Sequence, residues 1–504
     1  MKNISLTTIL FFFLLTGSAM CSMFIIRPLV RAEQVKHQGL STRDAFLSKN
    51  TRLINRNSEV ILVRSGNFTT ITMSNDFKGN VKDFAMVVPV PVVLKEGDIK
   101  TVSNQMFTML DAYSSPRIEE KADYNPCENQ VASNRRYNQT TAVDSHMKTT
   151  AVQPVSPKID PYKVKVEATY KIDEYDIIIL SAQESNGLKL WLKDNDYLFP
   201  EKADKILEPY IKNKMKFFVV KINADRLKER GNKINPLQIK FESPKFTLPI
   251  RLGMTNADDF QDMVVYAITD VGRVECANYR TVNIPTNRNI PTFVKKDFAK
   301  FYKDLFEREY EYQGKNAIFL EYAWNISPNG LRKCNPCIAN APTLNDMVNM
   351  GVNWDTRAKG VHFTRLHVRY TEDKFPQDLL FQVTPNKATF QAKYIVTKPA
   401  KGDFSCYLGQ EYLTDVINRR QRELDELQHL AGWDPNDRPL YVKGYQDMLN
   451  NEVDRNDLIL PFIPQNDGNG MLPKLIFTLL IALSVILFLG RSYSRSSKRK
   501  IPSV

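Results

Sequence analysis

The sequence predicts an α+β protein with mostly antiparallel strands, a few packed helices and one C-terminal transmembrane helix. Runs of β-branched and aromatic residues alternate with polar residues along the chain, which is typical of half-buried strands. Hairpin signals join neighbouring runs at 58–74 and 262–284. An uncharged apolar run occupies residues 475–490. Together these features predict a folded body on a single membrane anchor.

The chain begins with the pattern of a signal peptide. Lys2 is followed by an apolar run and then by small residues. Cleavage is expected near Ala19 or Cys21, or as late as Ala32, because apolar character continues past the first small residues. We therefore assign residues 1–32 to the signal and expect the body to be exported.

The apolar run near the other end is long enough to cross a bilayer. With residues 471–474 included, it reaches the roughly 20 residues that a spanning helix needs at about 1.5 Å per residue. Five cations follow it and mark the cytoplasmic side. We expect a transmembrane helix at 471–490 and a basic cytoplasmic tail at 491–504. A cleaved sorting signal is the alternative, although "LPKL" lacks the Thr-Gly of the familiar sortase motif.

The first half of the body contains the first hairpin and one helix. Ser65-Gly66-Asn67 forms the turn of the hairpin at 58–74. Two prolines confine the apolar run 84–93 to an edge strand or a strand end. Helical spacing follows at 104–115, and the unpatterned residues 125–158 predict an exposed loop.

The second half continues with strands and one aromatic helix. A strand leads into a helix over 175–195, and a second hairpin is predicted around Asp270-Val271-Gly272. The helix over 297–312 carries an aromatic stripe that includes Phe301 and Tyr302, which we expect to be packing. Further strands are predicted at 164–172, 215–222, 316–324, 363–370, 379–383 and 388–397.

These elements define the predicted domain organisation. The exported α+β body covers 44–407 and is followed by a helical extension at 408–463, whose main helix runs over 414–431 and ends at Gly432. A polar stalk at 464–470 leads to the membrane.

Several unusual strings occur together in this body. They are "TMSNDFKGNVKDFAMVVPVPVVL", "EYDIIILSAQESNGLKLWL", "NYRTVNIP", "FLEYAW" followed by "CNPC", and "TRLHVRYTEDKFPQDLLFQ". In this combination the chain resembles the bacterial secreted or surface proteins grouped as domain of unknown function 2330, from about Asp44 to Trp433. The resemblance implies a bacterial envelope setting and transfers no catalytic residue.

Motifs for familiar chemistry are absent from the sequence. There is no G-x-S-x-G, H-E-x-x-H, phosphate-binding loop or dinucleotide fingerprint. His362 and His367 are five apart in a predicted strand, so their side chains point to opposite faces and do not share an ion. Carboxylate pairs such as those in "EYDI" and "REYEY" are interpreted as solvated. We therefore assign no catalytic, metal-binding or cofactor-binding residue and expect no cofactor.

Cys334 and Cys337 form the one motif that invites a chemical interpretation. The pair could be a structural disulfide, a redox centre or half of a metal site, and an oxidising compartment favours the disulfide. If the signal is cut after Cys21, an odd number of cysteines remains, so one thiol is expected to be free or paired between chains. The remaining cysteines are Cys127, Cys276, Cys334, Cys337 and Cys406.

Charge and topology indicate the setting of the protein. The net charge of +13 includes the five tail cations, and the remaining basic residues do not cluster with aromatics as nucleic-acid binding requires. The sequence therefore predicts a membrane protein whose body faces the periplasm or the cell surface. We interpret it as a binding or structural envelope module with a protein or surface-polymer partner. An envelope enzyme, either a thiol-disulfide oxidoreductase or an unrecognised hydrolase, is the alternative.

Overall fold

The computed structural model describes residues 24–28, 57–74, 85–128, 162–195, 197–198, 203–231, 234–256, 260–327 and 336–449. The chain divides into two compact units. Among the described residues, unit 1 comprises those up to Asp123 together with 162–398 and 423–433. Unit 2 comprises 124–128, 399–422 and 434–449.

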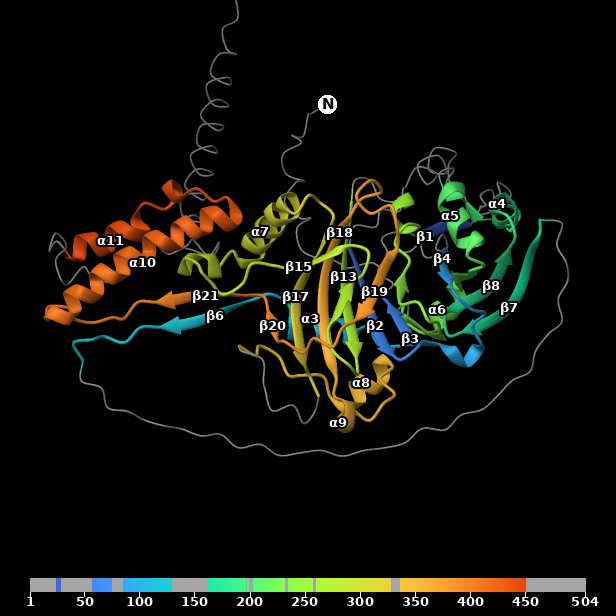
Figure 1. Ribbon diagram of the computed structural model, residues 1–504, viewed down its shortest axis with the longest axis horizontal. Coiled ribbons are helices and arrows are strands. Elements are labelled where there is room, and N and C mark those ends of the chain that lie inside the picture. Colours follow the sequence, from blue (N-terminus) through green and yellow to red (C-terminus); the bar gives the residue numbers. More distant parts are fainter. Residues whose placement is uncertain are drawn as a thin grey trace, which may run out of the picture. The chain divides into compact units, whose positions relative to one another are not determined.

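The largest sheet of unit 1 has nine strands among the described residues (Figure 1). Its order is β15-β17-β18-β13-β2-β3-β11-β5, and β20 pairs with β17. The strands are β2 (Asn57–Ser65), β3 (Phe68–Met73), β5 (Ile99–Thr101), β11 (Leu237–Glu242), β13 (Gln261–Thr269), β15 (Arg280–Asn283), β17 (Ala317–Asn325), β18 (His362–Tyr370) and β20 (Phe390–Gln391).

A second sheet of unit 1 contains six strands of the described chain, in the order β7-β8-β10-β4-β1-β9. They are β1 (Phe24–Pro28), β4 (Ala85–Val90), β7 (Val164–Ile172), β8 (Tyr175–Ala182), β9 (Tyr197–Leu198) and β10 (Lys216–Ile222). Pro89 lies near the end of β4, beyond the residues that pair with β1, so its missing N–H interrupts no bond on that side.

Two small sheets complete the strands of unit 1 that the structure describes. One has the order β12-β19-β14 and the other the order β16-β21-β6, whose pairs are parallel. Their strands are β6 (Arg117–Ala122), β12 (Thr247–Leu248), β14 (Val274–Cys276), β16 (Arg288–Asn289), β19 (Leu379–Val383) and β21 (Lys393–Lys398).

Helices cover the outer faces of the two large sheets. The α-helices of the described residues are α3 (Gln105–Ser114), α4 (Ser185–Asp194), α5 (Ala203–Lys212), α6 (Ala224–Glu229), α7 (Phe298–Tyr312), α8 (Leu344–Met350), α9 (Thr356–Lys359), α10 (Tyr407–Ala431) and α11 (Leu440–Leu449). Short 3-10 turns lie at Glu96–Asp98, Gly253–Asn256, Thr292–Lys295 and Pro435–Asp437.

Successive side chains of each strand point to opposite faces of the sheet, so apolar residues pack on both faces and form a layered core. Val60 and Leu62 of β2 face the six-stranded sheet, whereas Ile61 and Val63 face α3 and α8. The opposite face of the six-stranded sheet packs on α4 and α5. A fourth apolar cluster joins α7, β17, β21 and the last turns of α10, and contains the predicted stripe residue Phe301. Buried apolar side chains on both faces of both sheets account for the cohesion of unit 1.

The structure confirms the α+β class with mixed, mostly antiparallel sheets and several helices. Among the predicted strands, β7 and β19 have the predicted bounds, and β10, β17 and β18 match within one residue at each end. The predicted strand at 388–397 is divided into β20 and β21. The helix α10 begins at Tyr407 rather than Thr414 and ends before Gly432, whose φ of 73° is the left-handed conformation that closes helices.

Two predictions about local structure were wrong. The turn at Asp270-Val271-Gly272 exists, but β13 pairs with β2 and β18 while β14 pairs with β19, so 262–284 is not a hairpin. The predicted exposed loop at 125–158 is wrong at its start, because Asn125 is buried and Cys127 is disulfide-bonded. Residues 129–158 lie outside the described residues.

In the part of the chain that the structure describes, no helix combines the length and apolarity needed to cross a bilayer. The predicted transmembrane helix at 471–490, the stalk at 464–470 and the tail at 491–504 lie outside the described residues.

Candidate functional site

The predicted cysteine site is described only in part. Cys334 lies outside the described residues, so its pairing with Cys337 stays a prediction. Cys337 is exposed and disulfide-bonded. The preceding carbonyl, of Pro336, accepts hydrogen bonds from Arg117 Nη1 at 3.1 Å and from Gln391 Nε2 at 3.0 Å. Two buried side chains therefore fix the backbone next to Cys337.

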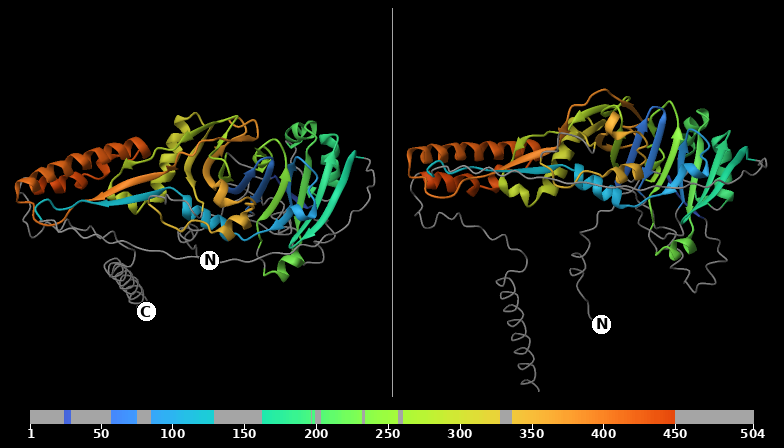
Figure 2. Two further views of the ribbon diagram at one scale, coloured as in Figure 1. Left: turned by 60° about the horizontal axis from the view of Figure 1, so that its bottom comes forward. Right: turned by 90° about the horizontal axis from the view of Figure 1, so that it is seen from below.

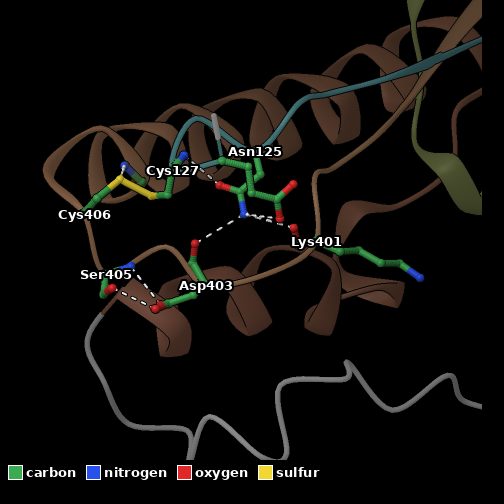
Figure 3. Close-up of a disulfide and its surroundings, with 8 residues drawn as sticks. Asn125, Cys127, Lys401, Asp403, Ser405 and Cys406 are labelled. Atoms are coloured by element: carbon green, nitrogen blue, oxygen red, sulfur yellow. Dashed lines mark hydrogen bonds between the residues drawn. A yellow bond between two sulfur atoms is a disulfide. The ribbon is translucent and has the colours of Figure 1, made fainter. Parts of the chain in front are cut away.

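A second disulfide, between Cys127 and Cys406, was not predicted (Figure 3). The two Cα atoms lie 6.0 Å apart although the residues are 279 positions apart in the sequence. Among the described cysteines, Cys276 is free and buried. The expected odd thiol depends on signal cleavage after Cys21, so it stays a prediction. Spacing along the sequence contains no signal for a pair so far apart.

Asn125 supports the Cys127–Cys406 disulfide. Its Nδ2 donates to the carbonyls of Lys401 and Asp403 at 3.1 and 3.3 Å, and its Oδ1 accepts from the N–H of Cys127 at 2.9 Å. Figure 3 shows Asn125 lying between the two chain segments that the disulfide joins. One buried amide thus satisfies backbone groups of both segments.

Among the described residues, several buried charges gather on β18. Arg365, His367 and Arg369 occupy alternate positions of this strand, so all three side chains project from one face. They interleave with the apolar Leu366 and Val368, which face the main core. We call this feature, together with the acidic partners Asp262 and Glu321, the ionic cluster.

Glu321 of β17 is the central acid of the ionic cluster. Its carboxylate is 1% exposed and lies 2.6 Å from Arg365 Nε and 2.9 Å from His367 Nδ1. The hydroxyl of Tyr302, from the aromatic stripe of α7, also donates to it. The register of β17 shifts between Leu320 and Tyr322, so Glu321 is the extra residue of a β-bulge. The bulge brings a carboxylate from an otherwise apolar strand to the cationic face of β18.

Asp262 of β13 neutralises the other end of the ionic cluster. Its two oxygens accept from Arg369 Nε and Nη2 at 2.7 and 2.8 Å, a bidentate geometry. His367 Nε2 lies 3.8 Å from the same carboxylate. The half-exposed Asp111 and Glu307 add contacts to Arg365 and Arg369 at 2.7 and 2.6 Å.

The surroundings of His367 hold its imidazole in the charged form. Burial alone would lower its pKa, but the charge of Glu321 and hydrogen bonds to Asp262 and Glu321 outweigh burial and raise the pKa to about 9. Phe306 stacks on the ring with centroids 3.9 Å apart, which also favours a cation. Burial would likewise raise the pKa of Glu321, but Arg365 and His367 lower it to about 2.

This electrostatic arrangement limits what the ionic cluster can do chemically. A general base must be largely unprotonated at the working pH, and His367 is protonated near neutrality. Its acidic partners are ionised and engaged by cations. The cluster therefore acts as a charged cross-link between β13, β17, β18 and α7. His362 lies on the opposite face of β18, as predicted, and burial lowers its pKa.

The interpretation of "EYDI" as a solvated acidic pair was wrong. Glu174 is fully buried, and its Oε1 accepts from the N–H of Asn235 at 2.7 Å. Arg230 Nε lies 3.5 Å from its Oε2. Asp176 is partly exposed and pairs with Arg226 at 2.6 Å. Both acids have basic partners in the fold, which the local sequence pattern did not reveal.

An open depression of about 340 Å³ lies on the face of β7 and β8 beside α6. It is lined by Thr169, Lys171, Asp176, Ile178, Asn223 and Arg226. β7 pairs on one side with β8, and no described strand pairs with its other side. This region therefore combines a polar depression with an open strand edge. No three or more side chains suited to a metal ion lie together in the part of the chain that the structure describes.

The fold and the sites define an α+β protein. Its first unit has an apolar core and a cluster of buried ion pairs, and its second unit is closed by a disulfide. The chain belongs to the family described as "Uncharacterized protein conserved in bacteria (DUF2330)", whose model matches residues 45–382. This finding confirms the predicted resemblance. The matched range contains the whole ionic cluster and ends before Cys406. No curated protein and no solved structure matches the chain.

Proposed function

We propose that the protein is a membrane-anchored module of the bacterial cell envelope that binds a partner outside the cytoplasm. Residues 471–490 anchor it, residues 491–504 stay in the cytoplasm, and the body faces the periplasm or the cell surface. The partner is a protein or a surface polymer. The observation that carries this proposal is the Cys127–Cys406 disulfide, because disulfides persist in oxidising compartments and are rare in a reducing cytosol.

The strand β1 supports export with an early signal cleavage. Phe24–Pro28 pair with β4 and β9 and so belong to the six-stranded sheet. Cleavage after Ala32 would remove this strand, whereas cleavage near Ala19 or Cys21 retains it. The mature protein is therefore proposed to begin before Phe24, and N-terminal sequencing of protein from membranes tests this directly.

The strand β7 supports a binding role. An unpaired strand edge accepts an added strand, and the adjoining depression offers Lys171 and Thr169 to polar groups. The ionic cluster supports the same interpretation, because its buried charges already pair with one another. We assign the contact with the partner to the β7 edge.

Crosslinking in living cells tests this contact. A photoreactive amino acid at Thr169 should give adducts with an envelope component. The matched control places it at Tyr312, which is 82% exposed and outside the depression. Equal adducts from both positions, or none from position 169, would contradict a partner at β7.

Protease accessibility tests the topology. Protease added to intact spheroplasts should remove the body and spare a tag at Val504, because only the tail is cytoplasmic. If the body resisted protease in intact spheroplasts, the proposed topology would be wrong. Intact mass distinguishes anchoring from sorting, since a sorted protein lacks the C-terminal segment.

One observation favours a second function, thiol-disulfide exchange by Cys334 and Cys337. Cys337 is disulfide-bonded at an exposed position, and accessible disulfides are the more labile ones. With dithiothreitol supplied as the reductant, a redox enzyme should cycle this pair between disulfide and dithiol. It should then reduce a model disulfide substrate with turnover that Cys334→Ser/Cys337→Ser abolishes. Equal, background rates in the wild type and the double variant would eliminate this alternative.

A further inference from the structure

Unit 2 exposes apolar side chains around its disulfide. Tyr124 is 81% exposed, Tyr407 80% and Leu408 54%. Tyr124 lies three residues before Cys127, while Tyr407 and Leu408 directly follow Cys406. We call these three residues the apolar tip. Such side chains are ordinary when scattered, but here they flank one cross-link.

A disulfide and several hydrogen bonds fix the backbone that carries the apolar tip. The disulfide joins its two segments, and Asn125 bridges them through the carbonyls of Lys401 and Asp403. Gly402 has a φ of 118°, and a Cβ at this position would lie 2.6 Å from Asn125 Nδ2. A fixed loop loses little conformational freedom on contact with a surface, which favours a binding role.

The described part of unit 2 ends near the same loop. In the apolar cluster of unit 2, the last residues of α11, Met448 and Leu449, pack near the start of α10, with Leu413 and Phe404. Tyr441, in the first turn of α11, instead lies over Arg420, farther along α10. The two helices are therefore antiparallel, and Figure 2 shows them side by side in both views. The described chain ends at Leu449, which belongs to the same apolar cluster as Phe404 of the disulfide-bonded loop.

The distance along the chain from this point to the apolar run is short. Residues 450–470 separate Leu449 from the segment 471–490. Even fully extended, these 21 residues reach at most roughly 75 Å. A bilayer that holds 471–490 is thus present at a high effective concentration next to the apolar tip.

We propose that the apolar tip rests on the outer surface of the bilayer in which residues 471–490 are anchored. Tyrosine is enriched at membrane interfaces, because its ring is apolar and its hydroxyl stays hydrated. Among the described residues, the exposed charges close in sequence to the tip include Glu128, Lys401, Asp403 and Glu411, which do not form a cationic patch. The contact is therefore apolar and does not require anionic lipid. This inference rests on the proposed membrane anchor.

Tryptophan quenching in vesicles tests the contact. The full chain is reconstituted in phosphatidylcholine vesicles that contain lipid brominated near the glycerol end of the acyl chains. Leu408→Trp adds a reporter at the tip, and Tyr312→Trp is the matched control at an exposed position of unit 1. The emission that each variant adds to that of the four native tryptophans is then compared.

The added emission of Leu408→Trp should be quenched by brominated lipid at least twofold more than that of Tyr312→Trp and should be shielded from aqueous iodide. Added salt should not change this result. Tyr407→Trp should behave like Leu408→Trp. Equal quenching of tip and control by iodide, without quenching by brominated lipid, overturns the inference. Shielding from iodide without lipid quenching means that protein covers the tip, which also overturns it.

A separate readout distinguishes failure of the anchor from failure of the tip contact. If an alkaline carbonate wash removes the chain from the vesicles, the proposed anchoring fails. If the chain remains in the vesicles and Leu408→Trp is still not quenched by brominated lipid, only the tip contact fails.

Discussion

Unit 1 and unit 2 hold distant parts of the chain together by different means. Unit 1 buries large apolar clusters and adds the ionic cluster, in which Glu321 and Asp262 pair with three cations of β18. The apolar cluster of unit 2 has three buried members among the described residues, Leu413, Val416 and Tyr445. A core this small offsets little conformational entropy, so a covalent bond supplements it.

This difference predicts how each unit responds to loss of its cross-link. An ion pair depends on both partners and on pH, whereas a disulfide depends on the redox state of the compartment. All four tryptophans lie in unit 1, so their fluorescence follows that unit alone.

The largest effect is expected from Glu321→Gln. This substitution leaves Arg365 and His367 buried beside a neutral amide, and removing one partner of a buried pair costs about 3–5 kcal/mol. Urea unfolding followed by tryptophan fluorescence measures the loss. The control is Glu307→Gln, because Glu307 pairs with Arg369 but is half exposed, and its loss should cost at most about 1 kcal/mol. Equal losses of unfolding free energy in the two variants would show that burial of Glu321 does not strengthen its contribution to stability.

The next effect is expected from Cys127→Ser/Cys406→Ser. Ala122 pairs with Lys398, so once β6 and β21 form, the disulfide closes a ring of roughly a dozen residues, worth about 3 kcal/mol. Hydrogen exchange in α11 and at 407–422 should accelerate, while tryptophan unfolding should not change. If the double variant also lowered the stability of unit 1, the disulfide would not act on unit 2 alone, which would contradict this prediction.

The pH dependence of unit 1 should follow His367. Its pKa is about 9 in the folded protein and about 6.5 when unfolded, so its stabilising charge is fully present below pH 6.5 and lost as pH rises through 9. We expect a decline on the order of 2 kcal/mol between these values. His367→Gln should flatten that part of the profile. A wild-type profile that stays level up to pH 9 would contradict the charged assignment.

The smallest effect is expected from Cys334→Ser/Cys337→Ser. A ring between these two residues is so short that its loss should cost only about 1 kcal/mol. Thiol counting on denatured, unreduced protein with peptide mapping checks the pairing itself. Alkylation of both cysteines by the thiol reagent would refute it.

Sequence patterns predicted parts of the ionic cluster's framework but not the cluster. The strand over 363–370 and the aromatic stripe with Tyr302 were predicted. The sequence also contained a signal for the three basic residues of the cluster. Arg365, His367 and Arg369 alternate with apolar residues and so share one face of a strand. That pattern also fits a solvated face, and only the partners from β13 and β17 distinguish a buried one.

The bulge in β17 shows why the acidic partner could not be predicted. Leu320 faces the main core, whereas Tyr322 faces the cluster around α3 and α8, although a regular strand would place them on the same side. Glu321 is the residue inserted between them. Sequence alternation cannot reveal a change of side that arises only in register with β18.

The sequence by itself determined the α+β class, most strands and helices, the family, and the expectation of an unpaired cysteine. These features depend on local periodicity, on combinations of short strings or on residue counts. Only the tertiary structure decided the parallel pairing of β2 with β13, the partners of the β18 cations and the Cys127–Cys406 bond. Each of these joins residues far apart in the sequence, and such contacts are selected by how whole sheets and helices bury their apolar faces rather than by any local pattern.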